Sequence, residues 1–304
     1  MTDFLANLTE AAGGPDEIRI GEPMKKHTTF RTGGPAAYFV TPPCKEKLAA
    51  VADLCRREHI PYYILGNGSN LLVSDKGYDG VMISMTKGFS HIQVQDRMIT
   101  AGSGALLSRI AKAALEESLT GLEFAAGIPG TLGGAVVMNA GAYGGEMKQV
   151  LKSVSVLTKD GQVKEIPAEE LELGYRSSCI QREEYVVLSA EILLETGDQA
   201  EIQARMDELA ARRREKQPLE YPSGGSTFKR PEGYFAGKLI EDAGLKGFTV
   251  GGAQVSEKHS GFVINRKNAA ASDVYELCRQ VQARVKEKFG VDLEMEVKRL
   301  GDFS

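Results

Sequence analysis

Two glycine-rich segments constrain this chain more than any other feature of its sequence. The first, here called the glycine turn, spans residues 66–70, and the second, the glycine stretch, spans residues 127–144. Glycine has no Cβ atom, so both segments can turn tightly and bring backbone close to another group. Glycine makes up 34 of 304 residues, about 11% against a usual level near 7%. The placement of these glycines therefore indicates where a ligand or another backbone approaches.

Length and composition describe an ordinary globular chain. A length of 304 residues predicts two or three folding units. The apolar fraction of 42% and the charged fraction of 26% are typical of globular proteins. A net charge of -4 provides no general attraction for nucleic acid or anionic lipid. Neither nucleic acid nor a membrane is therefore an expected partner.

The cysteines and the N-terminus indicate a cytoplasmic protein without a metal site. The four cysteines form no CxxC pair and have no histidine at metal-ligand spacing, so no metal is expected. The first ten residues lack the cationic start and apolar core of a secretory signal. No transmembrane segment is predicted, and reduced thiols in the cytoplasm are expected.

Alternating strand and helix signals predict three α/β units. A helix is expected over Lys45–His59, and Lys159-Asp160-Gly161 predicts a hairpin turn. A charged helix over Gln199–Lys216 and an amphipathic helix over Asp273–Phe289 follow, the second with Ser272 as N-cap. The predicted domains are 1–85, 86–198 and 199–304, with the strand near 293–304 returning to the first.

The glycine turn is a candidate site for a phosphate group. It follows the apolar Ile64-Leu65, and its residues tolerate positive φ and expose backbone N–H groups that can form an anion nest. No P-loop occurs, and the GxG patterns at Gly66 and Gly102 lack the third glycine of a dinucleotide fingerprint. An ordinary turn after a strand is the alternative.

The glycine stretch is a second candidate, because missing side chains let backbone approach a flat ligand. Gly133-Gly134-Ala135 can begin a helix whose amino end favours negative charge. Two such segments suit a long dinucleotide better than a mononucleotide. A close-packed structural loop is the alternative.

Three polar segments complete the candidates. Arg176 lies among short side chains and suits a carboxylate, which its guanidinium can bind in bidentate fashion. Ser226 lies in a flexible turn after Gly224 and Gly225, just before Lys229 and Arg230. These two cations can bind a diphosphate or favour deprotonation of the hydroxyl. In Leu293–Val297 the strand alternation places Glu294 and Glu296 on one face. A surface arginine, a plain turn and an exposed carboxylate pair are the alternatives.

Taken together, these motifs resemble one enzyme family. They are, in chain order, Thr29-Phe30-Arg31-Thr32-Gly33-Gly34-Pro35, Gly66-Asn67-Gly68-Ser69-Asn70, Gly127-Ile128-Pro129-Gly130-Thr131, Asn139-Ala140-Gly141-Ala142-Tyr143, Gly174-Tyr175-Arg176, Gly225-Ser226-Thr227-Phe228-Lys229 and Leu293-Glu294-Met295-Glu296-Val297. Their order over nearly the whole chain resembles the UDP-N-acetylenolpyruvoylglucosamine reductase family, FAD enzymes of bacterial peptidoglycan precursor synthesis. The resemblance implies a mixed α/β fold. It would have a two-part FAD-binding region of the vanillyl-alcohol-oxidase type and a C-terminal α/β substrate-binding domain.

The resemblance also assigns residues to FAD. They are Asn67, Gly68, Ser69, Asn70, Leu71, Gly127, Ile128, Pro129, Gly130, Gly133, Gly134, Asn139, Ala140, Gly141, Ala142 and Arg213. The nest argument from the glycine turn agrees with this assignment. Arg213 is one of three consecutive arginines, so its register is open by one residue.

The implied reaction is reduction of a UDP-linked enolpyruvyl sugar, with NADPH as reductant and FAD as carrier. Ser226 would protonate the substrate, while Arg176 and Glu296 would stabilise negative charge at its carboxylate. Lys229, Arg230 and His259 would bind the sugar nucleotide, and the resemblance implies a monomer.

One departure concerns closure over the substrate. The short Leu188–Asp198 connection leaves little room for the tyrosine-bearing insertion of the longer family form. A flavin oxidase and a non-catalytic sugar-nucleotide-binding protein remain as alternatives.

Overall fold

The computed structural model describes residues 2–304, apart from the side chains of residues 2 and 3. The helices are α1 (Thr2–Ala12), α2 (Lys45–Arg57), α3 (Leu107–Glu116), α4 (Leu132–Val137), α5 (Cys179–Glu183), α6 (Gln199–Lys216), α7 (Ala236–Asp242) and α8 (Ala271–Phe289). Short 3-10 helices are η1 (Pro15–Glu17), η2 (Met24–Lys26), η3 (Glu123–Ala125), η4 (Met147–Gln149) and η5 (Ala168–Glu170).

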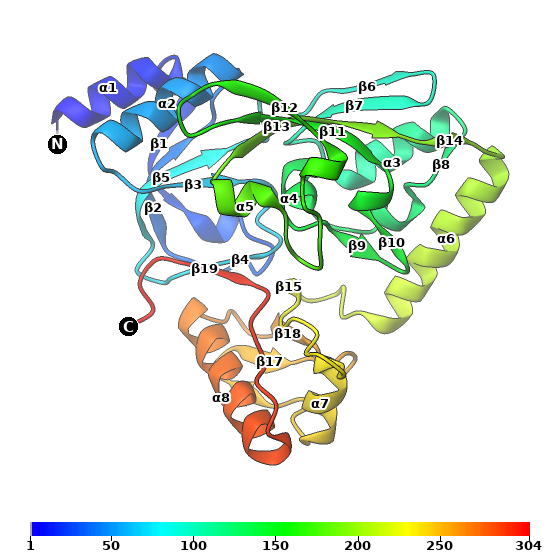
Figure 1. The fold of residues 1–304 in the computed structure, drawn as a ribbon. Helices are drawn as coiled ribbons and strands as arrows, with labels where there is room; N and C mark the ends of the chain where they lie inside the picture. Colours follow the sequence, from blue (N-terminus) through cyan, green and yellow to red (C-terminus); the bar gives the residue numbers. More distant parts are fainter. Residues whose placement is uncertain (1) are drawn as a thin grey trace. The chain divides into compact units, whose positions relative to one another are not determined.

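The strands are distributed along the whole chain (Figure 1). They are β1 (Ile18–Pro23), β2 (Pro35–Val40), β3 (Tyr62–Leu65), β4 (Leu71–Val73), β5 (Tyr78–Ser84), β6 (Ile92–Gln95), β7 (Met98–Gly102), β8 (Leu119–Thr120), β9 (Gly141–Ala142), β10 (Gly145–Glu146), β11 (Leu151–Leu157), β12 (Val163–Pro167), β13 (Val186–Leu193), β14 (Glu195–Thr196), β15 (Ser223–Ser226), β16 (Thr249–Val250), β17 (Ala253–Val255), β18 (Phe262–Asn265) and β19 (Lys298–Leu300).

The chain forms two compact units that each contain separate stretches of sequence. Unit 1 comprises the N-terminal residues up to Arg19, Phe39–Asn67 and Gly80–Arg213. Unit 2 comprises Ile20–Tyr38, Gly68–Asp79 and Arg214–Ser304. The division of the chain into three domains at residues 85/86 and 198/199 remains a prediction. The two compact units are defined by contacts and have other boundaries.

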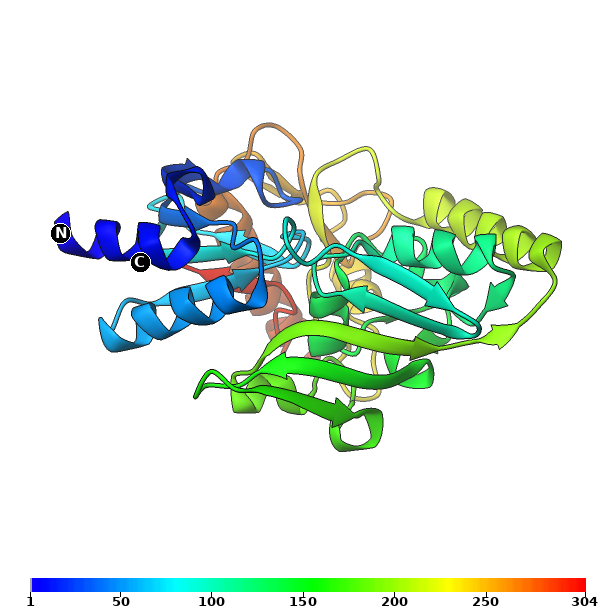
Figure 2. The ribbon, with the colours of Figure 1, turned by 90° about the horizontal axis from the view of Figure 1, so that it is seen from above.

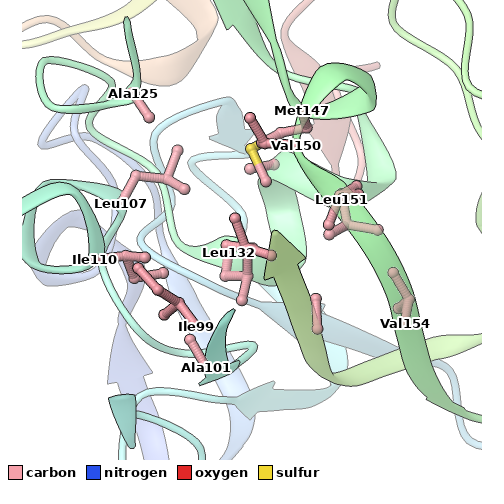
Figure 3. Packing of buried hydrophobic residues seen from close by; sticks show 14 of the residues in the cluster. Ile99, Ala101, Leu107, Ile110, Ala125, Leu132, Met147, Val150, Leu151 and Val154 are labelled. Atoms are coloured by element: carbon pink, nitrogen blue, oxygen red, sulfur yellow. The ribbon is translucent and has the colours of Figure 1, made fainter. Parts of the chain in front are cut away.

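An antiparallel five-stranded sheet forms the centre of unit 1, in the order β12-β11-β13-β7-β6. Figure 2 shows these strands running side by side. The predicted hairpin turn at Gly161, whose φ is +81°, joins β11 to β12. In Figure 3, Leu132 of α4 lies between side chains of α3 and of β11. Such burial contributes about 1.5–3 kcal/mol per large apolar side chain, so this core holds the start of α4 firmly.

The helix α2 packs along α1 in unit 1, as Figures 1 and 2 both show. Its buried residues Leu48, Val51 and Cys55 follow the helical spacing that predicted it. A further four-stranded sheet has the order β1-β2-β5-β3, in which β3 and β5 are parallel. The strand β3 leads directly into the glycine turn.

Unit 2 contains an antiparallel sheet in the order β15-β18-β17-β16, against which α8 packs. Val274, Leu277, Cys278, Val281 and Val285 of α8 are fully buried, which confirms the predicted apolar face. Near the C-terminus, β19 pairs in parallel with β4 (Figure 1). This pairing brings the end of the chain beside the residues that follow the glycine turn.

One local prediction was wrong. Ser272 is not the N-cap of α8, because the helix begins at Ala271, two residues before the predicted start, and Asp75 accepts hydrogen bonds from the N–H groups of Ala271 and Ser272 at 2.7 and 2.8 Å. A carboxylate from a distant loop therefore satisfies the helix terminus. In Leu293–Val297, Leu293 and Val297 are buried and Glu294 is exposed, as the predicted alternation requires, and Met295 forms a bridge with Phe228.

The charged helix over Gln199–Lys216 is confirmed as α6. Asp198 accepts hydrogen bonds from Ala200 N and Glu201 N at its start, and Pro218 follows its end. Within residues 2–304, no helix combines the length and apolar character needed to cross a bilayer.

Candidate functional site

Gly66 and Asn67, the first two residues of the glycine turn, contact the glycine stretch within unit 1. The side-chain amide of Asn67 donates a hydrogen bond to the carbonyl of Pro129 at 2.6 Å. A Cβ atom on Gly66 would overlap the hydroxyl of Thr131, so only glycine fits there without a shift. Two segments separated by about sixty residues therefore form one glycine-lined surface.

A third segment, Gly102-Ser103-Gly104, contacts the glycine stretch. The carbonyl of Ser103, within the rejected GxG pattern at Gly102, accepts a hydrogen bond from Gly133 N at 2.8 Å. The Ser103 side chain is 2% exposed, and among the described residues its hydroxyl has no hydrogen-bond partner. Buried hydroxyl groups in proteins are nearly always hydrogen-bonded, so a ligand group is expected to form a hydrogen bond with Ser103. The signal in the sequence was a serine between two glycines.

The first turn of α4 contains Gly133 and Gly134, as the sequence predicted. A Cβ atom on Gly133 would crowd Ser103 Cβ at 2.9 Å, whereas one on Gly134 would meet nothing nearer than Thr131 Oγ1 at 4.0 Å. Glycine within a helix is unfavourable by about 0.5–1 kcal/mol relative to alanine. Protein packing thus explains Gly133 but not Gly134, and close approach of a ligand would explain both.

Asn139 connects the end of α4 to the turn that contains Arg176. Its side chain is buried, donates to the carbonyl of Gly174 at 3.2 Å and to Glu146 at 3.1 Å, and accepts from Lys148 N at 2.9 Å. Both N–H groups of the side-chain amide are therefore used by protein partners. The side chain of Asn139 links the end of α4 to the turn that contains Arg176.

Arg176 lies in a tight turn closed by hydrogen bonds between Gly174 and Ser177. Its φ is +55°, an unfavourable conformation for a residue with a Cβ atom, and strain of this kind is common at functional sites. Its guanidinium carbon lies 5.1 Å from the centre of the Tyr175 ring. Ser178 Oγ donates to Val137 O at 2.8 Å, which anchors the turn to α4.

Of the three consecutive arginines, only Arg213 is partly buried and close to the glycine stretch. Arg212 and Arg214 are exposed, whereas Arg213 is partly buried, and a Cβ atom on Gly127 would lie 2.9 Å from its Nη1. Burial lowers the pKa of Arg213, although an arginine remains charged at neutral pH. The structure thus places a cation beside the start of the glycine stretch.

The other predicted cofactor residues lie in both units. In unit 1, Ile128 and Gly130 come just before α4, and Ala140, Gly141 and Ala142 follow it. In unit 2, Ser69 comes just before β4 and Leu71 begins it.

In unit 2, Ser226 is the last residue of a β-bulge, here called the serine bulge (residues 223–226). Ser223 pairs with Ile264 and Ser226 with Phe262, so β15 has one residue more than its partner strand. Gly225 takes φ +76°, and a Cβ atom on Gly224 would overlap the ring of Phe30. Bulges reorient side chains and are frequent next to active sites. Here the glycine pair leaves Ser226 exposed.

The segments of Ser226 and Glu296 are hydrogen-bonded to each other. Glu296 N donates to the carbonyl of Thr227 at 2.8 Å, and Lys229 N donates to the carbonyl of Glu294 at 2.9 Å. The side chain of Asn70 donates to the carbonyl of Glu296 at 3.2 Å, and Lys298 N donates to the carbonyl of Asn70 at 3.0 Å. Unit 2 therefore brings together three of the predicted site segments.

The predicted substrate-binding residues lie around this core. Lys229 Nζ is 2.5 Å from Glu294 Oε1, and the Arg230 guanidinium lies over the Phe235 ring at 4.5 Å. Partly buried His259 accepts a hydrogen bond at Nδ1 from Gly261 N, and burial lowers its pKa. Its neutral ring therefore carries hydrogen on Nε2, available for donation.

These features together fit a large anionic cofactor. Unit 1 contains Gly66 and Asn67 of the glycine turn, the glycine stretch and the segment of Ser103, whose buried hydroxyl has no partner among the described residues. It also contains Gly134, a helical glycine that packing does not explain, and the partly buried Arg213. Neither Ser103 nor Thr131 was predicted from the sequence to be a site residue, because their roles depend on contacts with glycines distant along the chain. The roles of the individual residues remain predictions.

Comparison with known proteins agrees with this interpretation. Residues 217–300 match the family described as UDP-N-acetylenolpyruvoylglucosamine reductase, C-terminal domain, and residues 36–167 match an FAD binding domain. UDP-N-acetylenolpyruvoylglucosamine reductase of Clostridium perfringens is 55% identical over 286 residues, 94% of each chain. The Clostridioides difficile protein of the same name is 53% identical over 300 residues, covering 99% of this chain and 98% of the other.

A solved structure gives the same result. The crystal structure of UDP-N-acetylenolpyruvylglucosamine reductase from Thermus caldophilus matches with a TM-score of 0.80 and 37% identity, covering 94% of this chain and 98% of the other. The mixed fold expected from the sequence, with an FAD-binding region and a distinct C-terminal domain, is confirmed. The chain therefore belongs to the UDP-N-acetylenolpyruvoylglucosamine reductase family and is an FAD-dependent oxidoreductase.

Proposed function

We propose that this protein reduces UDP-N-acetylglucosamine enolpyruvate to UDP-N-acetylmuramate with NADPH, in the cytoplasmic synthesis of peptidoglycan precursors. Family membership supports the substrate, and the FAD binding domain supports the redox chemistry. The observation that carries the proposal is the hydrogen-bonded pairing of the Ser226 and Glu296 segments in unit 2. It holds a hydroxyl and a carboxyl group on neighbouring segments.

Bound FAD would supply hydride transfer between NADPH and the terminal carbon of the enolpyruvyl group. The glycine turn, the glycine stretch and Arg213 would hold it, because they combine aimed backbone N–H groups, close approach and positive charge. Ser103 would supply a further hydrogen-bonding group. The protein's other residues then act on the substrate.

Hydride addition leaves negative charge on the adjacent carbon and its carboxylate. Arg176 supplies a permanent cation for that carboxylate, and protonated Glu296 donates a hydrogen bond to the enolate. The hydroxyl of Ser226 gives its proton to the adjacent carbon. This assignment divides the work between charge stabilisation and proton donation.

The diphosphate of the sugar nucleotide suits Lys229 and Arg230. The ion pair between Lys229 and Glu294 involves a largely exposed carboxylate, and such pairs contribute only about 0–1 kcal/mol. A doubly charged diphosphate can therefore recruit the Lys229 ammonium at little cost. His259, with hydrogen on Nε2, supplies a neutral donor beside these two cations in the proposal.

An anaerobic spectroscopic titration tests the proposal. The purified protein should show a flavin absorption band that bleaches with NADPH and returns with the UDP-linked enolpyruvyl sugar. Matched additions of NADH and of UDP-N-acetylglucosamine serve as controls. Rapid return in air without the enolpyruvyl sugar would indicate an oxidase instead. A colourless protein that binds the sugar nucleotide but cannot be reconstituted with FAD would contradict any redox function.

A further inference from the structure

The segment His27–Thr32 overlaps the motif Thr29–Pro35 and has no role in the proposed function. It lies in unit 2 between η2 and β2. Thr29 makes two hydrogen bonds there to two different predicted site segments. Its backbone N–H donates to the carbonyl of Gly68 at 3.2 Å, and its hydroxyl donates to the carbonyl of Ser223 at 2.6 Å.

Phe30 strengthens the contact with the serine bulge. Its side chain is fully buried, and its ring occupies the space that a side chain at position 224 would need. The carbonyl of Phe30 accepts a hydrogen bond from the buried amide of Asn265 at 2.9 Å, while Asn265 N donates to Pro222 O at 2.8 Å. The strand that carries Ser226 is thus held against this segment by both packing and hydrogen bonds.

The contact with the glycine turn is equally close. A Cβ atom on Gly68 would overlap the carbonyl of His27, and Gly68 takes φ +60°. His27 and Thr29 therefore bracket the backbone of Gly68. One short segment contacts the glycine turn through its backbone and the serine bulge through the Thr29 side chain.

We propose that Thr29 is a positioning residue that sets the register between the glycine turn and the serine bulge. The inference rests on the proposed function of Ser226 as proton donor. Gly224 and Gly225 lie between Ser223 and Ser226, and glycine restricts the backbone least. The hydrogen bond from Thr29 to Ser223 O fixes one end of this permissive pair, so its loss would let Ser226 move. A displacement of about 1 Å can cost a hundredfold in rate.

The test compares Thr29→Val with Thr29→Ser. Valine keeps the β-branched shape and the backbone N–H to Gly68 but removes the hydroxyl, whereas serine keeps the hydroxyl. Stopped-flow absorbance should show flavin bleaching by NADPH within about twofold of wild type in both. Return of the band with the enolpyruvyl sugar should slow about tenfold to a hundredfold in Thr29→Val. Thr29→Ser should stay within a few fold of wild type.

Thr249→Val is the matched control, since Thr249 also donates a hydrogen bond to backbone, the carbonyl of Gly247, within unit 2. It should leave both half-reactions unchanged. An unaffected return of the flavin band in Thr29→Val would overturn the inference. So would equal slowing of both half-reactions without rescue by serine, because that pattern indicates a general structural role.

Amide hydrogen exchange provides a readout that does not depend on activity. Exchange in residues 222–229 should rise in Thr29→Val but not in Thr29→Ser, and β11 should be unchanged. If wild type itself fails to regain the flavin band with the sugar, the proposed function fails, while exchange still decides whether Thr29 holds the bulge. Unchanged exchange would overturn the inference. If Thr29→Val does not fold, the same measurements on Thr29→Ala decide.

Discussion

In unit 1, the side chains of Asn67 and Asn139 link predicted site segments, whereas in unit 2 main-chain hydrogen bonds pair the Ser226 segment with the Glu296 segment. Asn67 and Asn139 donate to the carbonyls of Pro129 and Gly174 in unit 1. In unit 2, Glu296 N donates to Thr227 O, and Asn70 adds one side-chain contact. Substitution of Asn67 or Asn139 should therefore disturb the framework of unit 1, whereas substitution of Ser226 should change mainly the chemistry of unit 2.

The largest expected effect comes from Ser226→Ala in unit 2. The pairing of this segment uses backbone groups, so the variant should fold and bind FAD normally. Loss of a general acid costs about 10²–10⁴-fold in rate, and this loss should appear only in the flavin reoxidation by the enolpyruvyl sugar. Stopped-flow absorbance measures both half-reactions.

Ser223→Ala, in the same strand, is the control, because the carbonyl that accepts from Thr29 is retained. Equal slowing of both half-reactions in Ser226→Ala would remove Ser226 from its proposed role. It would also weaken the contrast between the two units.

Asn139→Ala tests the opposite case in unit 1. The change removes the acceptor of Lys148 N and one of the two donors to Gly174 O, which still accepts from Ser177 N. Loss of a hydrogen bond of this kind costs about 0.5–1.5 kcal/mol. The urea midpoint should fall and FAD should be released more readily, while substitution of exposed Gln95 by alanine should change neither. A variant with unchanged stability would show that side-chain amides are dispensable in unit 1.

Gly134→Ala separates packing from ligand approach. In the FAD-free protein the variant should be about 0.5–1 kcal/mol more stable, because alanine favours helix and its methyl group meets open space. FAD affinity should nevertheless fall, as measured by flavin fluorescence titration. Gly133→Ala should instead destabilise the FAD-free protein through contact with Ser103. Unchanged FAD affinity in Gly134→Ala would rule out close approach of the cofactor there.

The smallest effect concerns His259 in unit 2. Burial lowers the pKa of His259, so the folded state disfavours the protonated ring. Below about pH 6.5 the unfolded chain takes up this proton while the folded chain does not. This contribution to stability is therefore present above pH 6.5 and is lost as the pH falls.

Denaturation midpoints measured from pH 7.5 to 5.5 should thus fall more steeply for wild type than for His259→Gln. Substitution of exposed His91 by glutamine should preserve the wild-type slope. Identical slopes for wild type and His259→Gln would show that burial of this ring does not influence stability.

Helices and turns were predicted correctly where they depend on residues close together in the sequence. The α6 helix, the buried face of α8 and the turn at Gly161 arise from side-chain periodicity and turn chemistry over a few residues. The N-cap of α8 did not, because Asp75 competes from a loop almost two hundred residues away. The segment 293–297 has the predicted alternation of burial at its ends, and its pairing with another segment is one isolated β-bridge, between Met295 and Phe228.

For the site, the sequence by itself determined which residue types were available and, through their order, the family. It identified both glycine segments, and it identified Ser226 and Glu296 as candidates. Only the tertiary structure decided that Asn67 contacts Pro129, that Ser103 and Thr131 complete the glycine surface, and that Thr29 joins two site segments. These contacts link residues about 30 to 200 positions apart. Spacing along the chain carries no direct record of such pairs, because they depend on how whole sheets and helices pack.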